Sequence, residues 1–395
     1  MDKPLRILAV VNTPWDPRLG AARVWIDLAE EWRKSGHLVE KYCLTDAFPV
    51  PTSSPRISAL RLTLFPFCAA RFIRRNAHRF DVIDALAGTL ISSKKSLRFS
   101  GLLVARSVGL YDLYEKFEQT AARRWPSSRK GNILGRIFYG LFYKGVRAAT
   151  HASIRHCDLL NLPNSDELRF LRDEIGSLRS AMVQPYGLAV EHRQALWQAA
   201  ASSETRWQQK KICFIGMWTL RKGAKDWGEI IRLVRARVPE AQFLFLGTMA
   251  EDEKVRSDLG PGAVEWVELV ARYQPDALPQ LLSDCTVAAF PSYVEGFGLA
   301  VVEQLAAGIP VVAYDVTGPR DILHHSLPEL LVAPGDVVRF SEIIIDILTN
   351  NVSHYEELRR RSGQAAEAFS WPPIARATTE EYRRHLASLR GANET

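Results

Sequence analysis

The stretch TVAAFPSYVEGFGLAVVEQLAAGIPVVAYDVTGPRDIL, residues 286–323, decides how this chain folds. It contains two short apolar, β-prone runs, at residues 286–290 and 311–314, and turn-forming residues follow the first run. The apolar positions between the turn and the second run recur at helical spacing: Leu299, Val302 and Leu305. Gly308, followed closely by a proline, signals a helix end. The pattern predicts a strand, a glycine-rich turn, a short helix that begins just after Gly298, and a second strand.

The start of this predicted helix suits an anion. The first N–H groups of a helix have no intrahelical partner and carry about half a positive charge, which favours a negatively charged ligand. Gly296 and Gly298 have no side chains, so a phosphate group has room to approach the backbone. The sequence therefore predicts an anion-binding turn after the first strand.

Two glutamates bracket the predicted turn. Glu295 precedes the helix, and Glu303 lies four residues after Leu299. Because helical side chains lean toward the N-terminus, the carboxylate of Glu303 can reach back to a ligand at the helix start, where a diol such as a ribose would donate hydrogen bonds. Glu295 would then face the other end of that ligand. An ordinary turn of a parallel sheet with two solvated glutamates is the alternative interpretation.

The composition is that of a globular protein with room for two domains. A chain of 395 residues, 47% hydrophobic and 24% charged, can bury two cores of ordinary domain size. Its five cysteines are scattered without a C-x-x-C pair, which argues for a reducing compartment and against a disulfide framework or a zinc site. No apolar run predicts a transmembrane helix, and the apolar stretch in the start MDKPLRILAVVNTP is too short for a signal peptide.

Basic residues concentrate in one part of the chain. Residues 51–150 contain 18 Lys and Arg against 5 Asp and Glu, a density that recruits anionic partners. Residues 56–80 alternate basic and apolar groups, and residues 135–147, GRIFYGLFYKGVR, place an apolar stripe beside basic side chains. A membrane surface explains this pattern, and so does an ordinary core-facing helix with a solvated basic side. No nucleic-acid partner is expected, because no binding motif is present.

The residues around Glu295 and Glu303 closely resemble those of a known family. Seven residues separate the two glutamates, Gly-Phe-Gly-Leu lies between them, and AAGIPVVA follows. This arrangement resembles the sugar-nucleotide motif of the retaining glycosyltransferases of family four, which have the GT-B fold. In that family the first glutamate approaches the donor sugar and the second holds the ribose hydroxyls. The resemblance is strong over residues 211–335 and weaker in the first half of the chain.

A second loop completes the donor site that the resemblance implies. Residues 217–223, MWTLRKG, resemble the family's loop of phosphate-binding cations. Lys222 matches the usual lysine, whereas Met217 replaces the usual arginine, so Arg221 is expected to supply the second charge; a solvated surface lysine is the alternative for Lys222. Two cations can stabilise a departing diphosphate without a metal, so neither a metal nor another cofactor is expected. The implied catalytic residues are Glu295, Lys222 and Arg221, and the implied donor-binding residues are Gly20, Gly216, Phe297, Gly298, Leu299, Ala300 and Glu303.

Two positions in the first half depart from the family's pattern. The turn that contains Gly20 reads LGAA, so one glycine of the usual pair is absent. After a predicted strand at residues 102–106, most family members carry a histidine near the donor and the acceptor, and Val108 takes its place here. Valine can neither hydrogen-bond nor carry a proton, and Arg106 and Ser107 are the nearby substitutes.

The resemblance implies an α/β GT-B fold, in which two Rossmann-like, doubly wound parallel-sheet domains face a deep cleft. Residues 1–188 are expected to form the acceptor domain, completed by a C-terminal closing helix at residues 372–390 that crosses back to it. Residues 210–371 are expected to form the nucleotide-sugar donor domain, and the polar residues 189–209 are interpreted as the linker.

The implied function is sugar transfer, with retention of anomeric configuration, from a nucleotide-diphosphate sugar to a glycan or lipid-linked acceptor in cell-surface polysaccharide or glycolipid synthesis. The expected location is the cytoplasm, with residues 51–150 available for peripheral contact with an anionic membrane surface on its inner face. Val108 and Met217 leave open a degenerate GT-B protein that binds a sugar nucleotide or glycan without turnover. A sugar-nucleotide epimerase is a third possibility.

Overall fold

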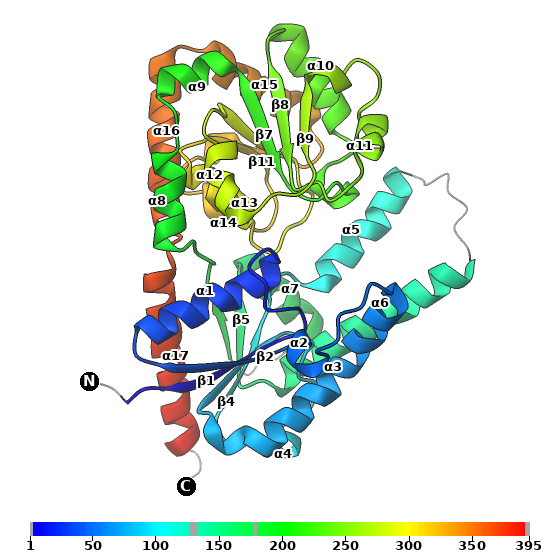
Figure 1. Cartoon of the computed structure of the whole chain (residues 1–395), viewed down its shortest axis with the longest axis vertical. Coiled ribbons are helices and arrows are strands. Elements are labelled where there is room, and N and C mark those ends of the chain that lie inside the picture. Colours follow the sequence, from blue (N-terminus) through cyan, green and yellow to red (C-terminus); the bar gives the residue numbers. More distant parts are fainter. Residues whose placement is uncertain (1–2, 126–132, 177–179, 392–395) are drawn as a thin grey trace. The chain divides into compact units, whose positions relative to one another are not determined.

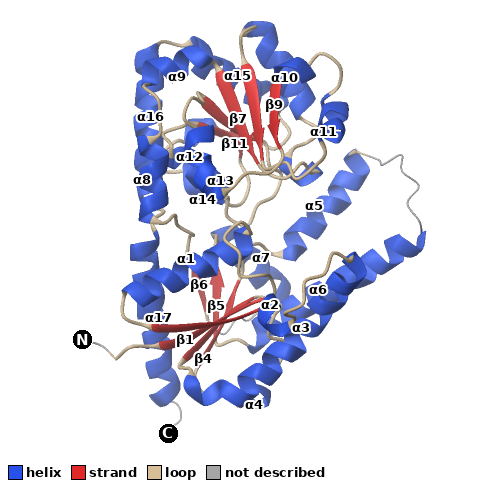
Figure 2. Ribbon diagram, in the orientation of Figure 1, coloured by secondary structure: helices blue, strands red, loops and turns tan. Residues whose placement is uncertain are grey.

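A computed structural model describes residues 3–125, 133–176 and 180–391, which form two compact units (Figure 1). The first unit combines Met1–Asp112, Pro126–Tyr186 and Trp371–Thr395, and the second combines Leu113–Trp125 and Gly187–Ser370. Each unit has a parallel six-stranded sheet with helices on its two faces (Figure 2). The predicted α/β architecture of two parallel-sheet units is confirmed, and the last helix of the chain belongs to the first unit.

The first unit consists of six strands and the helices that connect them. Its strands are β1 (Arg6–Val11), β2 (Leu38–Cys43), β3 (Val82–Leu86), β4 (Leu102–Arg106), β5 (Leu159–Leu162) and β6 (Ala181–Val183). Its helices are α1 (Gly20–Lys34), α2 (Leu44–Ala47), α3 (Pro55–Asn76), α4 (Lys94–Leu97), α6 (Ile133–His156), α7 (Ser165–Ile175) and α17 (Trp371–Gly391), with a 3-10 turn at Ala77–Arg79. Helix α5 (Tyr111–Arg124) begins here and continues into the second unit.

The first sheet has the strand order β2-β1-β3-β4-β5-β6, with parallel neighbours throughout. Strands β3, β4 and β5 are buried along their whole length, as expected for a parallel sheet covered on both faces. Helices α1 and α17 pack against each other and against the strands. The strand order reverses between β1 and β3, which gives this sheet a switch point at the carboxyl ends of those strands.

A buried ion pair fixes α17 to this sheet. Arg106, the last residue of β4, is fully buried, and its guanidinium donates to the Asp84 carboxylate on β3 at 2.7 and 3.1 Å. The same guanidinium donates to the Tyr382 hydroxyl on α17 at 3.0 Å, and the Trp25 indole on α1 donates to Asp84 at 3.1 Å. Residues far apart in the sequence therefore meet in one polar cluster inside the first unit.

The second unit has the same plan. Its strands are β7 (Lys211–Ile215), β8 (Gln242–Leu246), β9 (Val267–Val270), β10 (Val287–Phe290), β11 (Val311–Tyr314) and β12 (Leu331–Val332). Its helices are α8 (Val190–Gln198), α9 (Ser203–Gln209), α10 (Trp227–Arg237), α11 (Asp252–Leu259), α12 (Leu278–Leu281), α13 (Leu299–Ala306), α14 (Pro319–Leu323), α15 (Val337–Thr349) and α16 (Val352–Glu367). Short 3-10 turns lie at Leu220–Lys222, Val264–Trp266, Pro275–Ala277 and Pro328–Leu330.

The second sheet has the strand order β12-β11-β10-β7-β8-β9, which is the Rossmann order. Strands β7 and β10 are parallel neighbours, with Val287 opposite Ile212 and Ala288 opposite Cys213. The chain winds away from this pair in both directions, so the switch point of the sheet lies between β7 and β10. Ligands of such sheets bind outside the carboxyl ends of the strands at this point.

Two stretches form helices that their sequence patterns did not indicate. Residues 56–80, which alternate basic and apolar groups, lie almost entirely in the long helix α3. The stretch 189–209, interpreted as a polar linker, forms α8 and α9 within the second unit, where Leu196 and Arg206 are buried. The expected apolar stripe at residues 135–147 falls in α6, and most of its side chains lie outside the described residues.

Candidate functional site

The two loops that the sequence singled out meet at the switch point of the second sheet. Residues 216–223 follow β7, and residues 291–298 follow the neighbouring strand β10. The backbone N–H of Tyr293 donates to the carbonyl of Arg221 at 2.8 Å, so the loops are joined directly. Gly223 has a φ of 78°, and a Cβ atom there would lie 2.3 Å from the carbonyl oxygen of Pro291. Only glycine allows this backbone contact.

Three charged side chains from these loops form one cluster. The Lys222 Nζ lies 2.5 Å from the Glu295 carboxylate, and an Arg221 guanidinium nitrogen lies 3.8 Å from it. All three side chains are mostly withdrawn from water. The structure thus brings Glu295 together with Arg221 and Lys222, although 73 positions of the sequence separate Lys222 from Glu295. Two cations face one carboxylate, so the cluster carries a net positive charge.

The environment of Lys222 makes a further anion favourable. Burial lowers the pKa of Lys222 from its ordinary value, the Arg221 guanidinium lowers this pKa further, and the Glu295 carboxylate opposes both effects. The ammonium also lies 4.8 Å from the centre of the Phe290 ring. A phosphate beside Lys222 would add a second negative partner to a cation that water hydrates poorly.

Gly216 leaves room for the aliphatic part of the Lys222 side chain. A Cβ atom at Gly216 would lie 3.4 Å from the Lys222 Cδ and 3.1 Å from the Phe214 ring. A larger residue would therefore crowd the lysine side chain. Met217, the neighbour that stands where the family usually has arginine, is exposed.

The start of α13 lies directly after this cluster. Gly298 is the N-cap residue with a φ of 100°, and Leu299 and Ala300 form the first turn, both half-buried. A glycine has no side-chain oxygen to cap the helix, so these N–H groups remain open to a ligand. The buried Phe297 packs closely against Gly318. A Cβ atom at Gly318 would lie only 2.3 Å from the Phe297 carbonyl oxygen, so the two backbone segments are in direct contact.

Glu303 has a partner that the sequence did not indicate. Its carboxylate lies 3.2 Å from the Nε2 of His192 on α8, and the glutamate side chain is only 7% exposed. His192 lies 111 positions from Glu303, in the stretch interpreted as a linker. We therefore regard His192 as a positioning residue that orients the carboxylate one turn into α13.

A buried carboxylate also braces the loop after β10. Asp226 accepts hydrogen bonds of 2.7 Å from the hydroxyls of both Tyr293 and Tyr314. Burial raises the pKa of Asp226, and the two hydroxyls oppose that rise. The Phe117 ring stacks on Tyr293 at 5.5 Å. No sequence motif marks these residues, because each is an ordinary tyrosine, phenylalanine or aspartate until the fold brings them together.

Gly20, the donor-binding residue predicted in the first half, belongs to the other unit. It is the first residue of α1, and a Cβ atom there would meet nothing within 4 Å. The backbone conformation of this protein therefore does not itself require glycine at that position.

The substitutes considered for the family's histidine have other partners. Arg106 is fully buried against Asp84, so the hypothesis that it replaces the histidine is wrong. Ser107 donates to the Glu167 carboxylate at 2.6 Å, and burial raises the pKa of Glu167 to about 7. Val108 is half-buried in the loop that follows β4. The first unit therefore offers a buried serine–glutamate pair beside Val108, and neither member is exposed to solvent.

Within residues 3–125, 133–176 and 180–391, no three His, Cys, Asp or Glu side chains are grouped closely enough to hold a metal ion.

Comparison with known proteins gives matches over different parts of the chain. Residues 209–350 match the family described as Glycosyl transferases group 1. A D-inositol 3-phosphate glycosyltransferase from Nocardioides sp. is 31% identical over 143 residues, 35% of this chain and 31% of that protein. A sucrose-phosphate synthase from Thermosynechococcus elongatus has a TM-score of 0.71 at 19% identity, covering 97% of this chain and all of the other. Anabaena HepE, solved with UDP and glucose, has a TM-score of 0.67 at 16% identity, covering 96% and 100%.

The fold of the protein is GT-B, as shown by the two parallel-sheet units and by the structural likeness over nearly the whole chain. Residues 209–350 match the glycosyl transferases group 1, in agreement with the family that the motif from Glu295 to Glu303 predicted. This chain aligns with about a third of the length of the matched Nocardioides relative.

Proposed function

We propose that the protein is a retaining glycosyltransferase that uses a nucleotide-diphosphate sugar. One observation carries the proposal: Lys222 and Arg221 converge on Glu295 at the switch point of the second sheet, directly before the uncapped start of α13. Two cations and the N–H groups of Leu299 and Ala300 match the charge of a diphosphate. Retention is proposed because the motif resembles that of retaining family four.

In the proposed reaction, the bond between the anomeric carbon and the diphosphate oxygen breaks, and its electron pair leaves with the nucleoside diphosphate. An acceptor hydroxyl forms the new bond to the anomeric carbon, and its proton passes to the departing diphosphate oxygen. Lys222, Arg221 and the N–H groups of Leu299 and Ala300 stabilise the charge that grows on the leaving group, so no metal is required. Glu295 lies beside the departing sugar, and Glu303 accepts hydrogen bonds from the ribose.

The donor to be tested first is UDP-glucose. This choice rests on the fold likeness to HepE, whose structures contain UDP, glucose or UDP-glucose. The acceptor is proposed to be a glycan or lipid-linked glycan, in cell-surface polysaccharide or glycolipid synthesis.

Glu303→Ala is expected to weaken the binding of the matching nucleoside diphosphate by about 10- to 100-fold. Two ribose hydroxyls would lose a charged acceptor, which is worth about 1.5–3 kcal/mol. Isothermal titration calorimetry with UDP measures the change. Glu342→Ala is the matched control, because Glu342 is a solvated glutamate on α15 of the same unit. An unchanged affinity for UDP in the Glu303 variant, with wild-type binding established, would remove the ribose assignment.

Turnover separates an enzyme from a degenerate binding protein. Wild-type protein that binds UDP at the site and releases UDP from UDP-glucose in the presence of acceptor supports the transferase. Binding without release over a panel of donors and acceptors would favour the degenerate alternative that Val108 and Met217 motivate. Conversion of the donor sugar without transfer would identify an epimerase.

The exposed face of α3 supports contact with an anionic membrane surface. Apolar side chains recur along it at helical spacing and are exposed to solvent: Ile57 (46%), Leu60 (57%), Leu64 (41%) and Phe67 (62%). Exposed arginines stand on the same helix: Arg56, Arg71, Arg74 and Arg75. Soluble monomers rarely leave a contiguous apolar patch in water, whereas apolar and basic groups on one helix face fit a lipid interface.

We therefore propose a cytoplasmic protein bound peripherally to the inner face of the membrane, near a lipid-linked acceptor. Within the described residues, no helix is both long and apolar enough to cross a membrane.

The double substitution Leu60→Ser and Phe67→Ser is expected to reduce binding to anionic vesicles by about tenfold or more, since burying each apolar side chain contributes about 1.5–3 kcal/mol. Flotation with phosphatidylglycerol-containing and pure phosphatidylcholine vesicles provides the measurement. Val338→Ser is the control, because Val338 is 57% exposed on α15 in the second unit. Equal flotation on both kinds of vesicle would contradict an electrostatic membrane contact.

A further inference from the structure

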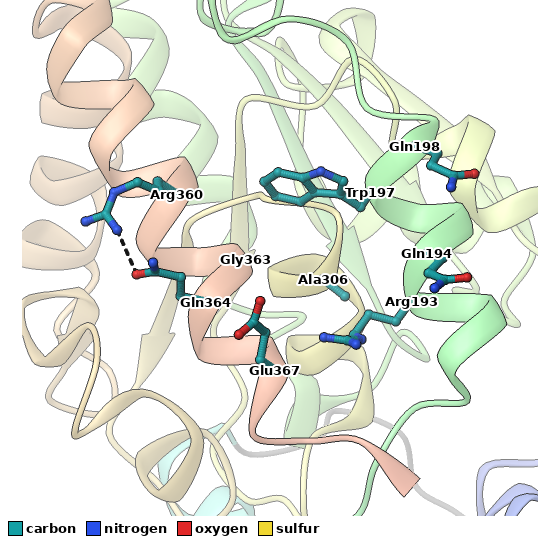
Figure 3. A pocket seen from close by; sticks show the side chains of 9 residues that line it. All are labelled: Arg193, Gln194, Trp197, Gln198, Ala306, Arg360, Gly363, Gln364 and Glu367. Atoms are coloured by element: carbon teal, nitrogen blue, oxygen red, sulfur yellow. Dashed lines mark hydrogen bonds between the residues drawn. The ribbon is translucent and has the colours of Figure 1, made fainter. Parts of the chain in front are cut away.

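A surface cavity of 340 Å³ lies in the second unit, apart from the charged cluster around Lys222. Its walls are α8, the end of α13 and α16 (Figure 3). The volume falls within the range of about 300–1,000 Å³ that is usual for small-molecule sites. No part of the proposed transfer reaction uses this cavity.

One wall of the cavity is the indole of Trp197 on α8. Its side chain is 45% exposed, which is unusual for so large an apolar group on a helix that packs against two others. A Cβ atom at Gly363 would lie 2.6 Å from the Trp197 Cζ3, and one at Gly308 would lie 2.9 Å from it. The Arg359 guanidinium lies 5.3 Å from the indole centre. The two glycines and the arginine therefore hold the ring in place while part of it stays accessible.

Polar groups surround this aromatic wall. Arg193 on α8 and Glu367 on α16 point into the cavity from opposite sides (Figure 3). They form no ion pair with each other, and the Nε of Arg193 is buried without a hydrogen-bond partner among the described residues. Gln194 and Gln198 line the edge of the cavity, and their amides point to the side of α8 away from Glu367 (Figure 3). The cavity therefore offers donors and acceptors that the protein leaves available around one aromatic ring.

We propose that this cavity binds a neutral pyranose sugar, as a saccharide site separate from the donor site. A pyranose ring has an apolar C–H face that can lie on Trp197 and a rim of hydroxyls that both donate and accept. Hydroxyls can accept from Arg193 and donate to Glu367 at the same time, so one sugar spans the gap between the two charges.

Other ligand classes fit less well. An anion would gain from Arg193 but would be repelled by the Glu367 carboxylate, and the other arginine that lines the cavity, Arg360, is already paired with Glu357. A purely apolar ligand would cover Trp197 but would leave both charged groups desolvated without partners. A neutral polyol with one apolar face satisfies the aromatic and the polar groups together.

The site shares its walls with the donor-binding elements. Ala306 lines the cavity three residues after Glu303 on α13, and Arg193 follows His192, the partner of Glu303. The saccharide site can thus hold part of a glycan while Glu303 holds a nucleotide. Binding of sugar here does not depend on transfer activity, so its test is separate from that of the proposed function.

Saturation-transfer NMR with the full chain and no nucleotide tests the proposal. The probes are methyl α-D-glucopyranoside, methyl α-D-mannopyranoside and methyl α-D-galactopyranoside at millimolar concentration, with glucuronic acid for comparison. Saturation is expected on ring C–H groups of at least one neutral glycoside, and more weakly on glucuronic acid. Trp197→Ala is expected to weaken binding at least tenfold, whereas Trp266→Ala, which removes another partly exposed tryptophan of the same unit, leaves it unchanged.

A second variant guards against a folding defect in Trp197→Ala. Glu367→Leu changes an exposed residue at the end of α16, leaves the indole in place, and is expected to weaken binding at least threefold. Absence of saturation on all three neutral glycosides would overturn the proposal. So would binding that both substitutions leave at the wild-type level, or a clear preference for glucuronic acid.

Discussion

Replacing Lys222 by alanine is expected to lower the rate constant for sugar transfer by a factor of about 100 to 1,000, the range measured when one pre-positioned donor to a developing anion is lost. Lys222 sits next to Glu295, mostly withdrawn from water, and it would contact the diphosphate whose charge grows as the glycosidic bond breaks. The loss should fall mainly on kcat, because the interaction strengthens as the leaving group departs. Steady-state release of nucleoside diphosphate measures it.

Lys225→Ala is the matched control for this experiment. Lys225 lies three residues later, is 44% exposed, and is 3.7 Å from Asp258 rather than in the cluster. Its removal should leave kcat within a factor of two. If Lys222→Ala retained the wild-type kcat while Lys225→Ala did not, the assignment of the phosphate-binding cation would have to move.

Arg106→Met is expected to lower the free energy of unfolding of the first unit by about 3–5 kcal/mol. The substitution leaves the Asp84 carboxylate in a fully buried position without its cation, and breaking one side of a buried ion pair has a cost of about this size. The hydroxyl of Tyr382 would also lose a donor. Because a two-unit chain need not unfold in one step, hydrogen exchange of the β3 and β4 amides is the suitable measurement.

Arg6→Met provides the comparison for burial. Arg6 also stands on a strand of the first sheet and pairs with Asp81 at 2.9 Å, but its side chain is 44% exposed. Surface pairs of this kind contribute about 0–1 kcal/mol. Equal losses in the two variants would contradict the view that burial makes Arg106 essential to the first unit.

Local sequence signals gave the central elements of the second unit. The predicted helix start after Gly298 and the strand at residues 311–314 agree with α13 and β11, because the glycine stop signals and apolar runs act within a few residues. The predicted strand at residues 286–290 begins one position early, since β10 starts at Val287. Such elements depend little on the rest of the fold, so the sequence alone was sufficient.

Helix α3 shows why other elements were not predicted. Pro66 lies inside it, and an internal proline costs about 3 kcal/mol and removes a backbone hydrogen bond. The helix forms because the side chains on its inner face are buried: Phe65, Ala69, Ala70 and Ile73. That burial depends on tertiary contacts, which no local pattern reports.

The contacts within the site were also beyond the reach of sequence. The sequence motifs indicated Glu303 and Lys222 as separate residues. They did not indicate that His192 would contact Glu303. The brace of Asp226 by two tyrosines was likewise absent from any pattern. The two members of each of these hydrogen-bonded pairs are 67 to 111 positions apart in the sequence. They meet only because the strand order of the sheet brings their segments together.

The contact between Gly223 and Pro291 has a practical consequence for anyone who wishes to alter donor preference by exchanging segments with a relative. The two backbones touch with no space for one extra carbon. A loop that contains position 223 will therefore fit only the loop at position 291 that comes from the same protein. Chimaeras should therefore exchange both segments at once, and single swaps should yield misfolded or inactive protein.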